Sequence, residues 1–286
     1  MTMHKTQKFF YQDACFNIHH TVSENAEDPS FHLHIHNLYE IYCFLQGEGL
    51  FTVGGSTYKL ESGMILFLRP GDAHSIQITK DKPYERICLH FDSAYFRENA
   101  AMSALLQRFD AETGRFGNCF LIQDTASYPL QLLKAMVNPE IRAQKEQLLA
   151  LESNLPALLY GLSTYASYEA NAENASSDRL VQQIIRYIDE NLANDWSLDM
   201  LAAELYRDKA YLSRRFKSVV GTSIWDYTIQ KRIIAAQRNI YRTGSVTEAF
   251  KLSGFKDYST FFRNYQKVTG VSPSDDMKKY EEHRLI

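Results

Sequence analysis

One segment of the chain, from Ser197 to Pro273, contains two similar copies of a helical unit, and this duplication limits the folds open to the sequence. Over the later part of each copy a shift of 49 positions aligns Arg214 with Arg263, Val219 with Val268, Gly221 with Gly270 and Ser223 with Ser272. Upstream the shift is 48 positions, so one loop is a residue longer. Internal similarity of this kind indicates one supersecondary unit used twice.

Each copy has the pattern of a helix-turn-helix. Apolar residues recur at the i, i+3, i+4, i+7 spacing of a short helix at Leu198, Leu201, Ala202 and Leu205. A second helix is predicted to begin at Asp208, whose carboxylate can cap it, and to end at Gly221. Its apolar face is predicted to consist of Tyr211, Leu212 and Phe216. The second copy repeats this order, with helices over 246–252 and 258–268 around a turn at Gly254.

The two second helices have the character of DNA-reading helices, because each pairs an apolar side with a polar, cationic side that fits a major groove of about 12 Å. Two helical hairpins with solvated basic faces are the alternative. The segment Ser223–Arg242 between the copies has no Pro or Gly and predicts a single helix. About 20 residues at 1.5 Å each span roughly 30 Å, close to the distance of about 34 Å between successive major grooves.

This part of the chain resembles the DNA-binding domain of the AraC family of bacterial transcription regulators. The resemblance rests on Leu201-Ala202, on Tyr211 to Lys217, on Gly221-Thr222-Ser223, on Gly254-Phe255, on Phe261-Phe262-Arg263 and on Gly270 to Pro273. It implies base contacts from the first recognition helix at Lys209, Ala210, Ser213 and Arg214, and from the second at Tyr258, Ser259 and Arg263. Lys217, one turn beyond Arg214, is expected at a phosphate. The second copy departs from the family pattern at Ala249-Phe250, at Ser253 and at Asp275-Asp276-Met277.

Length and charge predict two domains, with the DNA-binding one at the C-terminus. Residues 1–176 carry 13 Lys and Arg against 20 Asp and Glu, whereas residues 177–286 carry 18 against 14. A cationic tail on an acidic body is what a DNA-binding appendage shows. We expect a first domain over 1–170, a linker over 171–177 and a second domain over 178–286. No apolar run approaches 18 residues and four scattered cysteines lack CxxC spacing, which predicts a cytoplasmic protein without a membrane segment.

The N-terminal part has the texture of a β domain followed by helices. From Phe9 to Phe91, aromatic and aliphatic runs alternate with Gly turns, which is typical of a sandwich or barrel. Helices are expected over 94–109, 128–137 and 141–168, with a short strand at 119–123. Pro156 is expected to kink or divide the last helix. The predicted class is therefore α+β, with an N-terminal cupin-like β-barrel and helices, then an all-α domain of two helix-turn-helix units joined by a long helix.

A histidine and glutamate pattern in the β region resembles the two signature motifs of the cupin barrel. His34 and His36 are two residues apart and so share one side of a strand; Glu40 follows four residues later and His74 comes eleven residues after Gly63. In cupin enzymes, residues that match this pattern bind a divalent metal, and imidazole with carboxylate suits Fe, Mn, Ni or Zn. His34, His36, Glu40 and His74 are thus candidate metal ligands, although neither a cofactor nor a catalytic residue is predicted.

Ligand recognition or simple hydrogen bonding within the barrel are the other uses of these side chains. In sensor domains of the AraC family, a similar pattern lines a pocket. Alternation along the strands predicts a pocket lined by His34, His36, Glu40, Tyr42, His74, Arg86 and His90. Polar groups interleaved with aromatic rings suit a sugar or a related metabolite.

The leading hypothesis is therefore a transcription activator of the AraC type that binds double-stranded DNA, responds to a carbohydrate effector and acts on RNA polymerase. A homodimer is expected, because the leucines between Leu148 and Leu162 offer more apolar surface than one helix needs to cover a barrel. One alternative is a cupin metalloenzyme, a dioxygenase or sugar isomerase, with a helical appendage. A DNA-binding protein whose barrel serves only dimerisation is the other.

Overall fold

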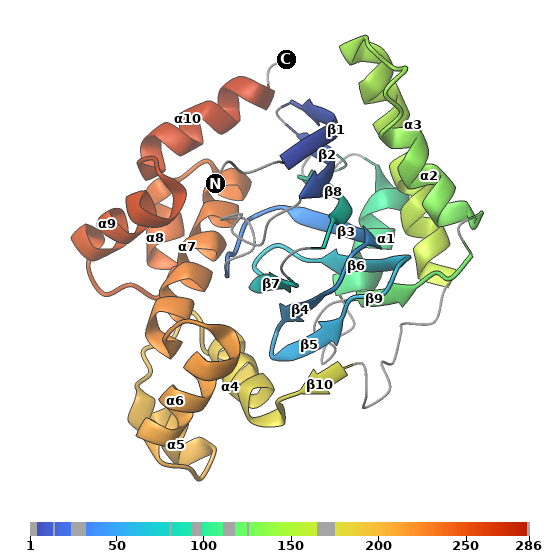
Figure 1. Cartoon of the computed structure of the whole chain (residues 1–286). Coiled ribbons are helices and arrows are strands. Elements are labelled where there is room, and N and C mark those ends of the chain that lie inside the picture. Colours follow the sequence, from blue (N-terminus) through green and yellow to red (C-terminus); the bar gives the residue numbers. More distant parts are fainter. Residues whose placement is uncertain are drawn as a thin grey trace. The chain divides into compact units, whose positions relative to one another are not determined.

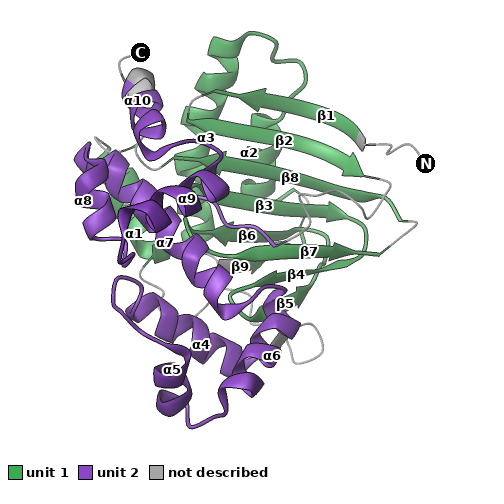
Figure 2. Ribbon diagram, turned by 90° about the vertical axis from the view of Figure 1, so that its left-hand side faces the viewer, with its two compact units in different colours: residues 1–32, 38–176 green, residues 33–37, 177–286 purple. Residues whose placement is uncertain are grey.

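The computed structural model describes residues 5–13, 15–23, 33–79, 82–92, 96, 99–110, 118–124, 126–164 and 175–284, and every structural statement below concerns these residues. Their contacts divide the chain into two compact units (Figures 1 and 2). Unit 1 comprises residues 1–32 and 38–176, and unit 2 comprises residues 33–37 and 177–286. No helix in the described ranges is long and apolar enough to cross a membrane.

Unit 1 contains two β-sheets. Its strands are β1 (Lys5–Gln12), β2 (Phe16–Ser23), β3 (Tyr39–Gln46), β4 (Gly49–Val53), β5 (Ser56–Lys59), β6 (Met64–Leu68), β7 (His74–Ile78), β8 (Tyr84–Phe91), β9 (Asn118–Leu121) and β10 (Ala175–Ser177). The larger sheet has the order β1-β2-β8-β3-β6-β9 and the smaller has the order β10-β5-β4-β7. The strand pairs β1-β2, β2-β8, β3-β8, β3-β6, β6-β9, β4-β5 and β4-β7 are all antiparallel.

The two sheets face each other across one hydrophobic core, so the expected cupin-like β domain is present as two facing sheets and not as a closed barrel. Side chains of the larger sheet, including Tyr42 and Leu66, pack with Phe51 and Ile76 of the smaller sheet. Among the described strands, no ladder joins one sheet to the other. Turn glycines such as Gly63, at φ +84°, with the Ile122 carbonyl only 2.1 Å from where a Cβ would stand, permit the tight reversals between short strands.

The opposite face of the larger sheet is covered by helices. These are α1 (Ala100–Asp110), α2 (Tyr128–Met136) and α3 (Gln144–Thr164), which bury their leucines against Ile41, Phe67 and Leu89. α3 runs continuously through Pro156, so of the two predicted effects of this proline, a kink or a division of the helix, the division does not occur. The buried leucines on both sides of the proline hold the helix together despite the missing N–H.

Five of the seven leucines between Leu148 and Leu162 are fully buried within unit 1. They are Leu151, Leu155, Leu158, Leu159 and Leu162. The apolar surface that the sequence assigned to a dimer interface is therefore mostly used by the core of unit 1, and among these leucines only Leu149 is strongly exposed, at 61%.

Unit 2 contains seven helices in its described part. They are α4 (Arg179–Glu190), α5 (Leu198–Glu204), α6 (Lys209–Val220), α7 (Ile224–Thr243), α8 (Val246–Lys251), α9 (Tyr258–Thr269) and α10 (Pro273–Arg284). The two predicted helix-turn-helix units are α5-α6 and α8-α9, and the single helix predicted between them is α7. Residues 165–174 of the predicted boundary region lie outside the described residues, and residues 175–177 of the predicted linker form strand β10.

Local signals fix the ends of these helices. The Asp208 carboxylate accepts hydrogen bonds from the backbone N–H groups of Ala210 and Tyr211, and the Asp257 carboxylate accepts one from Thr260 at the same place in the second copy. Gly221 and Gly270 end α6 and α9 in the left-handed conformation. The two copies therefore share caps as well as sequence.

Candidate nucleic-acid interface and effector site

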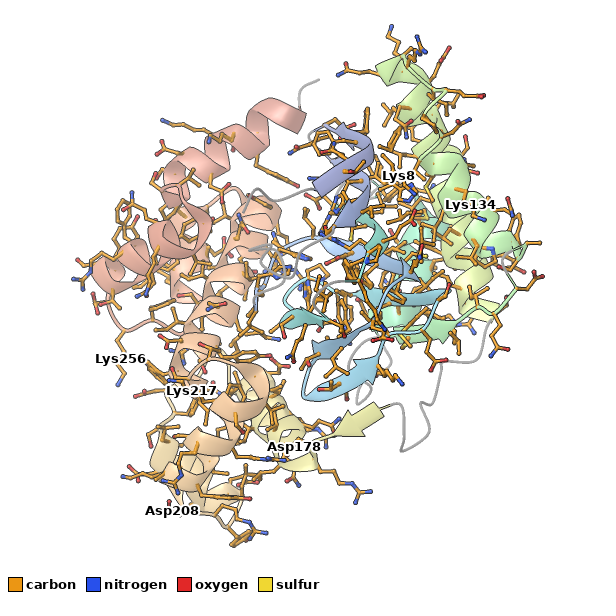
Figure 3. All side chains as sticks on the ribbon, viewed as in Figure 1. Lys8, Lys134, Asp178, Asp208, Lys217 and Lys256 are labelled. Atoms are coloured by element: carbon orange, nitrogen blue, oxygen red, sulfur yellow. The ribbon has the colours of Figure 1, made fainter. Side chains whose placement is uncertain are left out.

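The candidate DNA-binding residues of the first copy lie on one side of α6. Ala210, Ser213, Arg214 and Lys217 stand at positions i, i+3, i+4 and i+7, which places them on one helix face. Arg214 and Lys217 are exposed, and Figure 3 labels Lys217 on α6. The buried side is formed by Leu212, Phe216 and Val220.

The prediction that Tyr211 belongs to the apolar face of α6 is wrong, because this side chain is 46% exposed. Leu212, Phe216 and Val220 at four-residue intervals already fill the contact with the rest of unit 2, and Tyr211 is rotated away by 100° from Leu212. An exposed aromatic side chain at the start of a recognition helix is a further candidate for contact with DNA, which sequence reasoning missed.

Three polar residues of α6 already have intramolecular contacts. The Lys209 ammonium pairs with the Asp199 carboxylate at 2.8 Å, and the Ser213 hydroxyl donates to the Lys209 carbonyl at 2.8 Å. The Arg215 guanidinium pairs with Asp178, the N-cap residue of α4. Arg215 thereby connects α6 to the start of α4. The adjacent Arg214 is exposed and lies away from the buried side of α6.

In the second copy, α9 repeats this arrangement with an aromatic residue in place of Lys209. Tyr258 is 45% exposed and its ring packs against Phe250 and Phe261, with centroids 5.4 and 5.7 Å apart. Ser259 and Arg263 are exposed, and Arg263 makes a long hydrogen bond of 3.5 Å to the Thr260 hydroxyl. α9 therefore offers two cations, Arg263 and Lys267, and the Tyr258 ring, where α6 offers four cations.

The candidate effector residues of unit 1 are brought together by strand register. Glu40, Tyr42 and Phe44 alternate along β3, and the register sets them opposite His90, Cys88 and Arg86 of β8. His74 begins β7 of the smaller sheet, and its Nε2 lies 3.1 Å from Oε2 of Glu40. The Nε2 atom of His90 lies 3.4 Å from the same oxygen. The buried Glu40 carboxylate thus lies beside one histidine of each sheet, His90 of the larger and His74 of the smaller.

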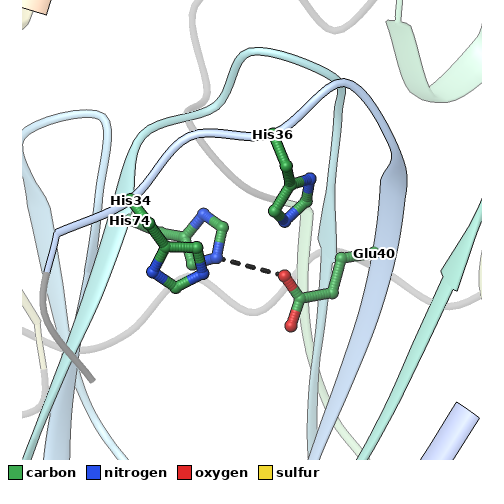
Figure 4. Close-up of side chains that lie close together, drawn as sticks. All are labelled: His34, His36, Glu40 and His74. Carbon is green, nitrogen blue, oxygen red and sulfur yellow. Dashed lines mark ion pairs between the residues drawn. The ribbon is translucent and has the colours of Figure 1, made fainter. Parts of the chain in front are cut away.

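His34 and His36 complete this group from the segment that leads into β3 (Figure 4). Each of His34, His36, Glu40 and His74 offers one ligand atom, and these four atoms lie within 4.8 Å of one another. Their spacing in the sequence predicted this convergence, since two histidines at i and i+2 and a glutamate four residues later enter the same strand end.

The protonation of His74 follows from its neighbours. Its Nδ1 atom lies 2.9 Å from the Asp72 carbonyl, which only accepts, so Nδ1 carries a proton. Burial by itself would lower the pKa of His74, but the Glu40 carboxylate and the Asp72 backbone raise the pKa above its ordinary value. In a neutral ring, the Nε2 lone pair would face a carboxylate oxygen, so a proton or a cation must lie between His74 and Glu40.

The interior beside this cluster contains further polar groups that are nine-tenths buried. The Tyr42 and Tyr84 hydroxyls are in direct contact, and burial raises both tyrosine pKa values above their ordinary range. The Arg86 guanidinium lies 5.1 Å from the centre of the Tyr84 ring. Sequence reasoning missed Tyr84, although its even number places it on the same strand face as Arg86 and His90.

A divalent metal fits the donor set of this cluster. Ligand atoms around an ion with bonds of about 2.1 Å are about 3.4 Å apart in tetrahedral geometry, so the four atoms need to close by only a small movement. The bond from Nδ1 of His74 to the Asp72 carbonyl is the outer contact that orients a metal-bound imidazole. Three imidazoles and one carboxylate suit Fe, Mn, Ni or Zn.

Comparison with known proteins agrees with both halves of this description. Residues 20–159 match a family model described as an AraC-like ligand binding domain, and residues 201–279 match one described as a helix-turn-helix domain. The two matches together span well over half of the chain.

Full-length relatives show the same organisation. The chain is 25% identical to the Msm operon regulatory protein of Streptococcus mutans, over 93% of this chain and 94% of that protein. It is 23% identical to the transcriptional activator RhaS of Yersinia pseudotuberculosis, over 89% and 92%. Among solved structures, ToxT from Vibrio cholerae is similar with 15% identity and a TM-score of 0.39, over 93% of this chain and 98% of that one. The chain therefore belongs to the AraC family of transcription regulators, with a ligand-binding domain and a DNA-binding helix-turn-helix domain.

Proposed function

We propose that this regulator senses a carbohydrate or a related polyhydroxylated metabolite through the cluster around Glu40 and His74. The observation that carries the proposal is the buried carboxylate that meets histidines from both sheets within 3.4 Å. Carboxylate and imidazole groups accept and donate hydrogen bonds to hydroxyls, and the nearby rings of Phe51 and Tyr42 offer apolar faces for a sugar ring.

The effector acts in this proposal by binding one state of the regulator more tightly than another. A ligand shifts a conformational balance only by its difference in affinity for the two states, and no bond needs to be broken. Recognition by Glu40 and His74 would therefore suffice without catalysis. The proposal includes a cytoplasmic homodimer that activates transcription through RNA polymerase; the relative RhaS is named an activator.

On the DNA side, we propose that Lys209, Ala210, Ser213, Arg214 and Lys217 of α6 and Tyr258, Ser259 and Arg263 of α9 contact the operator. The exposure of Arg214, Lys217, Ser259 and Arg263 supports this assignment. The proposal requires the ion pair of Lys209 with Asp199 to open or to share its ammonium with a phosphate, at little cost because both groups are exposed.

The effector proposal is tested with Glu40→Gln and His74→Ala in the full-length chain. A panel of sugars and sugar acids is first screened by thermal shift on the wild type. Operator binding with and without the best ligand is then measured by fluorescence anisotropy. Both variants are expected to bind DNA and to lose the ligand response at least tenfold. Glu85→Gln is the matched control, because Glu85 also accepts from a histidine, His20, at 2.7 Å in the same sheet. Equal loss in the control would contradict the assignment.

A second candidate function for this site is the binding of a divalent metal. It is favoured by the distance of 3.1 Å between His74 Nε2 and Glu40 Oε2, two atoms that can both bind one ion. Metal content of the purified full-length chain, measured by mass spectrometry, separates the two. Stoichiometric Zn, Fe, Mn or Ni that is lost in His74→Ala and retained in Glu85→Gln would establish a metal-dependent sensor. Sugar response without stoichiometric metal would leave direct recognition by the side chains.

A further inference from the structure

Arg232, near the middle of α7, is a buried cation at the centre of unit 2. Its side chain is 5% exposed, and its guanidinium donates three hydrogen bonds of 2.8 Å each. Nε donates to the Leu192 carbonyl, Nη2 to the Asn194 carbonyl and Nη1 to the Gly254 carbonyl. These four residues are called the Arg232 junction below.

The three carbonyls belong to the two different DNA-binding units. Leu192 and Asn194 lie between α4 and α5, in the segment that enters the first helix-turn-helix. Gly254 lies in the turn between α8 and α9 of the second. The Arg232 side chain therefore connects the segment that enters the first helix-turn-helix to the turn of the second. Arg232 itself lies on α7, the helix between these two copies.

The junction is closely packed. Gly254 has φ +76°, and a Cβ at this position would lie 2.7 Å from the Leu192 carbonyl oxygen and 3.0 Å from Nε of Arg232. The guanidinium also lies over the rings of Trp225 and Phe255, at 5.7 and 6.0 Å from their centres. Burial lowers the pKa of Arg232, and the three carbonyls compensate for the water that its charge has lost.

Arginine is required here because only its planar, forked group serves three carbonyls at once. A lysine ammonium at the same stem length is a single point and cannot reach acceptors spread around a guanidinium plane. The three hydrogen bonds of the Arg232 guanidinium go to backbone carbonyls of the protein, so the role of this side chain is to hold segments of unit 2 together.

We propose that Arg232 is a positioning residue that sets the separation and rotation of the two recognition helices, and hence the operator spacing that the regulator accepts. This rests on the proposed function in one respect, that both α6 and α9 enter DNA. α7 packs against the second helix-turn-helix through Ile233 and Ile240, which share a core with Phe261, and against the first through the Tyr227 ring, whose centre lies 5.3 Å from that of Phe216. The Arg232 junction adds a polar attachment of α7 to the entrance of the first helix-turn-helix and to the turn of the second. This attachment restricts the rotation of each helix-turn-helix about α7.

The inference is tested with operators of altered spacing. A DNA duplex that the full-length wild type selects from random sequence is the starting operator. It is rebuilt with one or two base pairs added or removed between the two half-sites, which are here the segments contacted by α6 and by α9 of one chain. Two added base pairs move the second half-site by about 7 Å and rotate it by roughly 70°. Wild type is expected to lose about tenfold or more in affinity. Arg232→Met and Arg232→Lys are expected to bind the original duplex more weakly and to lose no more than about threefold on respacing.

A matched pair of glycine variants separates the junction from general backbone strain. Gly254 and Gly270 both have φ near +77°, at +76° and +78°, but a Cβ on Gly270 would meet no atom within 4 Å. Alanine therefore strains the backbone similarly at both positions and disturbs the junction only at Gly254. Gly254→Ala is expected to flatten the spacing profile, and Gly270→Ala is expected to retain the wild-type profile.

The salt dependence of binding excludes a direct role on DNA. If Arg232 touched a phosphate, its loss would reduce the slope of log affinity against log salt by about 0.9; an unchanged slope is expected. Circular dichroism checks the folding of each variant, and Arg232→Lys or Gly254→Ala takes the place of Arg232→Met if that variant does not fold. A steep spacing profile retained in the folded variants overturns this inference alone, whereas a wild type without spacing dependence overturns the proposed use of both recognition helices.

Discussion

Arg214 and Arg215 are adjacent in the sequence, yet the structure gives them different surroundings. Arg214 is exposed on the polar face of α6, whereas Arg215 pairs with Asp178. We therefore expect Arg214→Ala to cost about 1–3 kcal/mol at one operator base pair, most simply a guanine. Lys217→Ala should weaken binding to all sequences alike and reduce the salt slope by about 0.9. Competition assays against single-base operator variants measure both effects.

The control for this prediction is Arg215→Ala, which removes an equal charge from the same turn of α6. It is expected to leave the base preference intact, because its partner is a carboxylate of the protein. If Arg214→Ala left both affinity and base preference unchanged, α6 would not be a recognition helix.

Tyr206 is the one described non-glycine residue with a positive φ, at +52°, and it is 87% exposed. Under the 48-residue shift it aligns with Gly254, so the same left-handed turn is made by tyrosine in one copy and by glycine in the other. An L-residue is strained there, and Tyr206→Gly should raise the free energy of unfolding by about 1 kcal/mol or less. Tyr206→Ala keeps the strain and should not stabilise. Equal urea midpoints for the two variants would refute this account.

At the scale of helices, a buried carboxylate attaches α10 to its neighbours. Asp276 is 8% exposed and accepts hydrogen bonds from Gln237 and Tyr241 of α7 at 2.7 and 2.8 Å, and from Tyr265 of α9 at 2.7 Å. Burial, with the Asp276 carboxylate, raises the pKa of Tyr265 above its ordinary range, so this phenol stays a donor. The acidic residue that departs from the family pattern is thus part of the core.

We expect Asp276→Ala to destabilise unit 2 by about 2–4 kcal/mol, because it leaves three donors without their acceptor in a largely buried place. Tyr265→Phe should cost about 1–2 kcal/mol, since one donor is lost and the carboxylate retains two. Asp275→Ala is the neighbouring control; its carboxylate is exposed and bonds only locally to Ser272, so a change within about 1 kcal/mol is expected. Urea denaturation followed by tyrosine and tryptophan fluorescence measures all three.

At the scale of the whole molecule, the proposed dimer would use a small exposed apolar surface of unit 1. Tyr128 of α2 and Leu149 and Tyr160 of α3 are exposed by 58, 61 and 63%. If α3 forms a two-fold interface, Leu149→Lys with Tyr160→Glu should convert a dimer into a monomer at tens of micromolar in sedimentation experiments. Phe10→Lys changes an equally exposed residue of β1, at 51%, and should leave the dimer intact. A wild type that is monomeric with and without DNA would contradict the proposal.

The sequence by itself determined the features that depend on nearby residues. The two helix-turn-helix units, the cap at Asp208 and the helix ends at Gly221 and Gly270 follow from patterns within one or two turns of helix. The meeting of Glu40 with His90 also followed from alternation, because the period of a strand fixes which side chains share a face.

Only the tertiary structure decided what long-range contacts control. The sequence places Arg232 and Asp276 in helices but says nothing of the carbonyls 22 to 40 residues away that the guanidinium serves, or of the tyrosines that the carboxylate accepts from. It did not decide whether the strands of the cupin-like domain close into a barrel or form the two facing sheets that are observed, and it assigned Tyr211, which is exposed, to the apolar face of α6. In each case the outcome depends on which distant surface fills the space beside a residue, and periodicity carries no information about that surface.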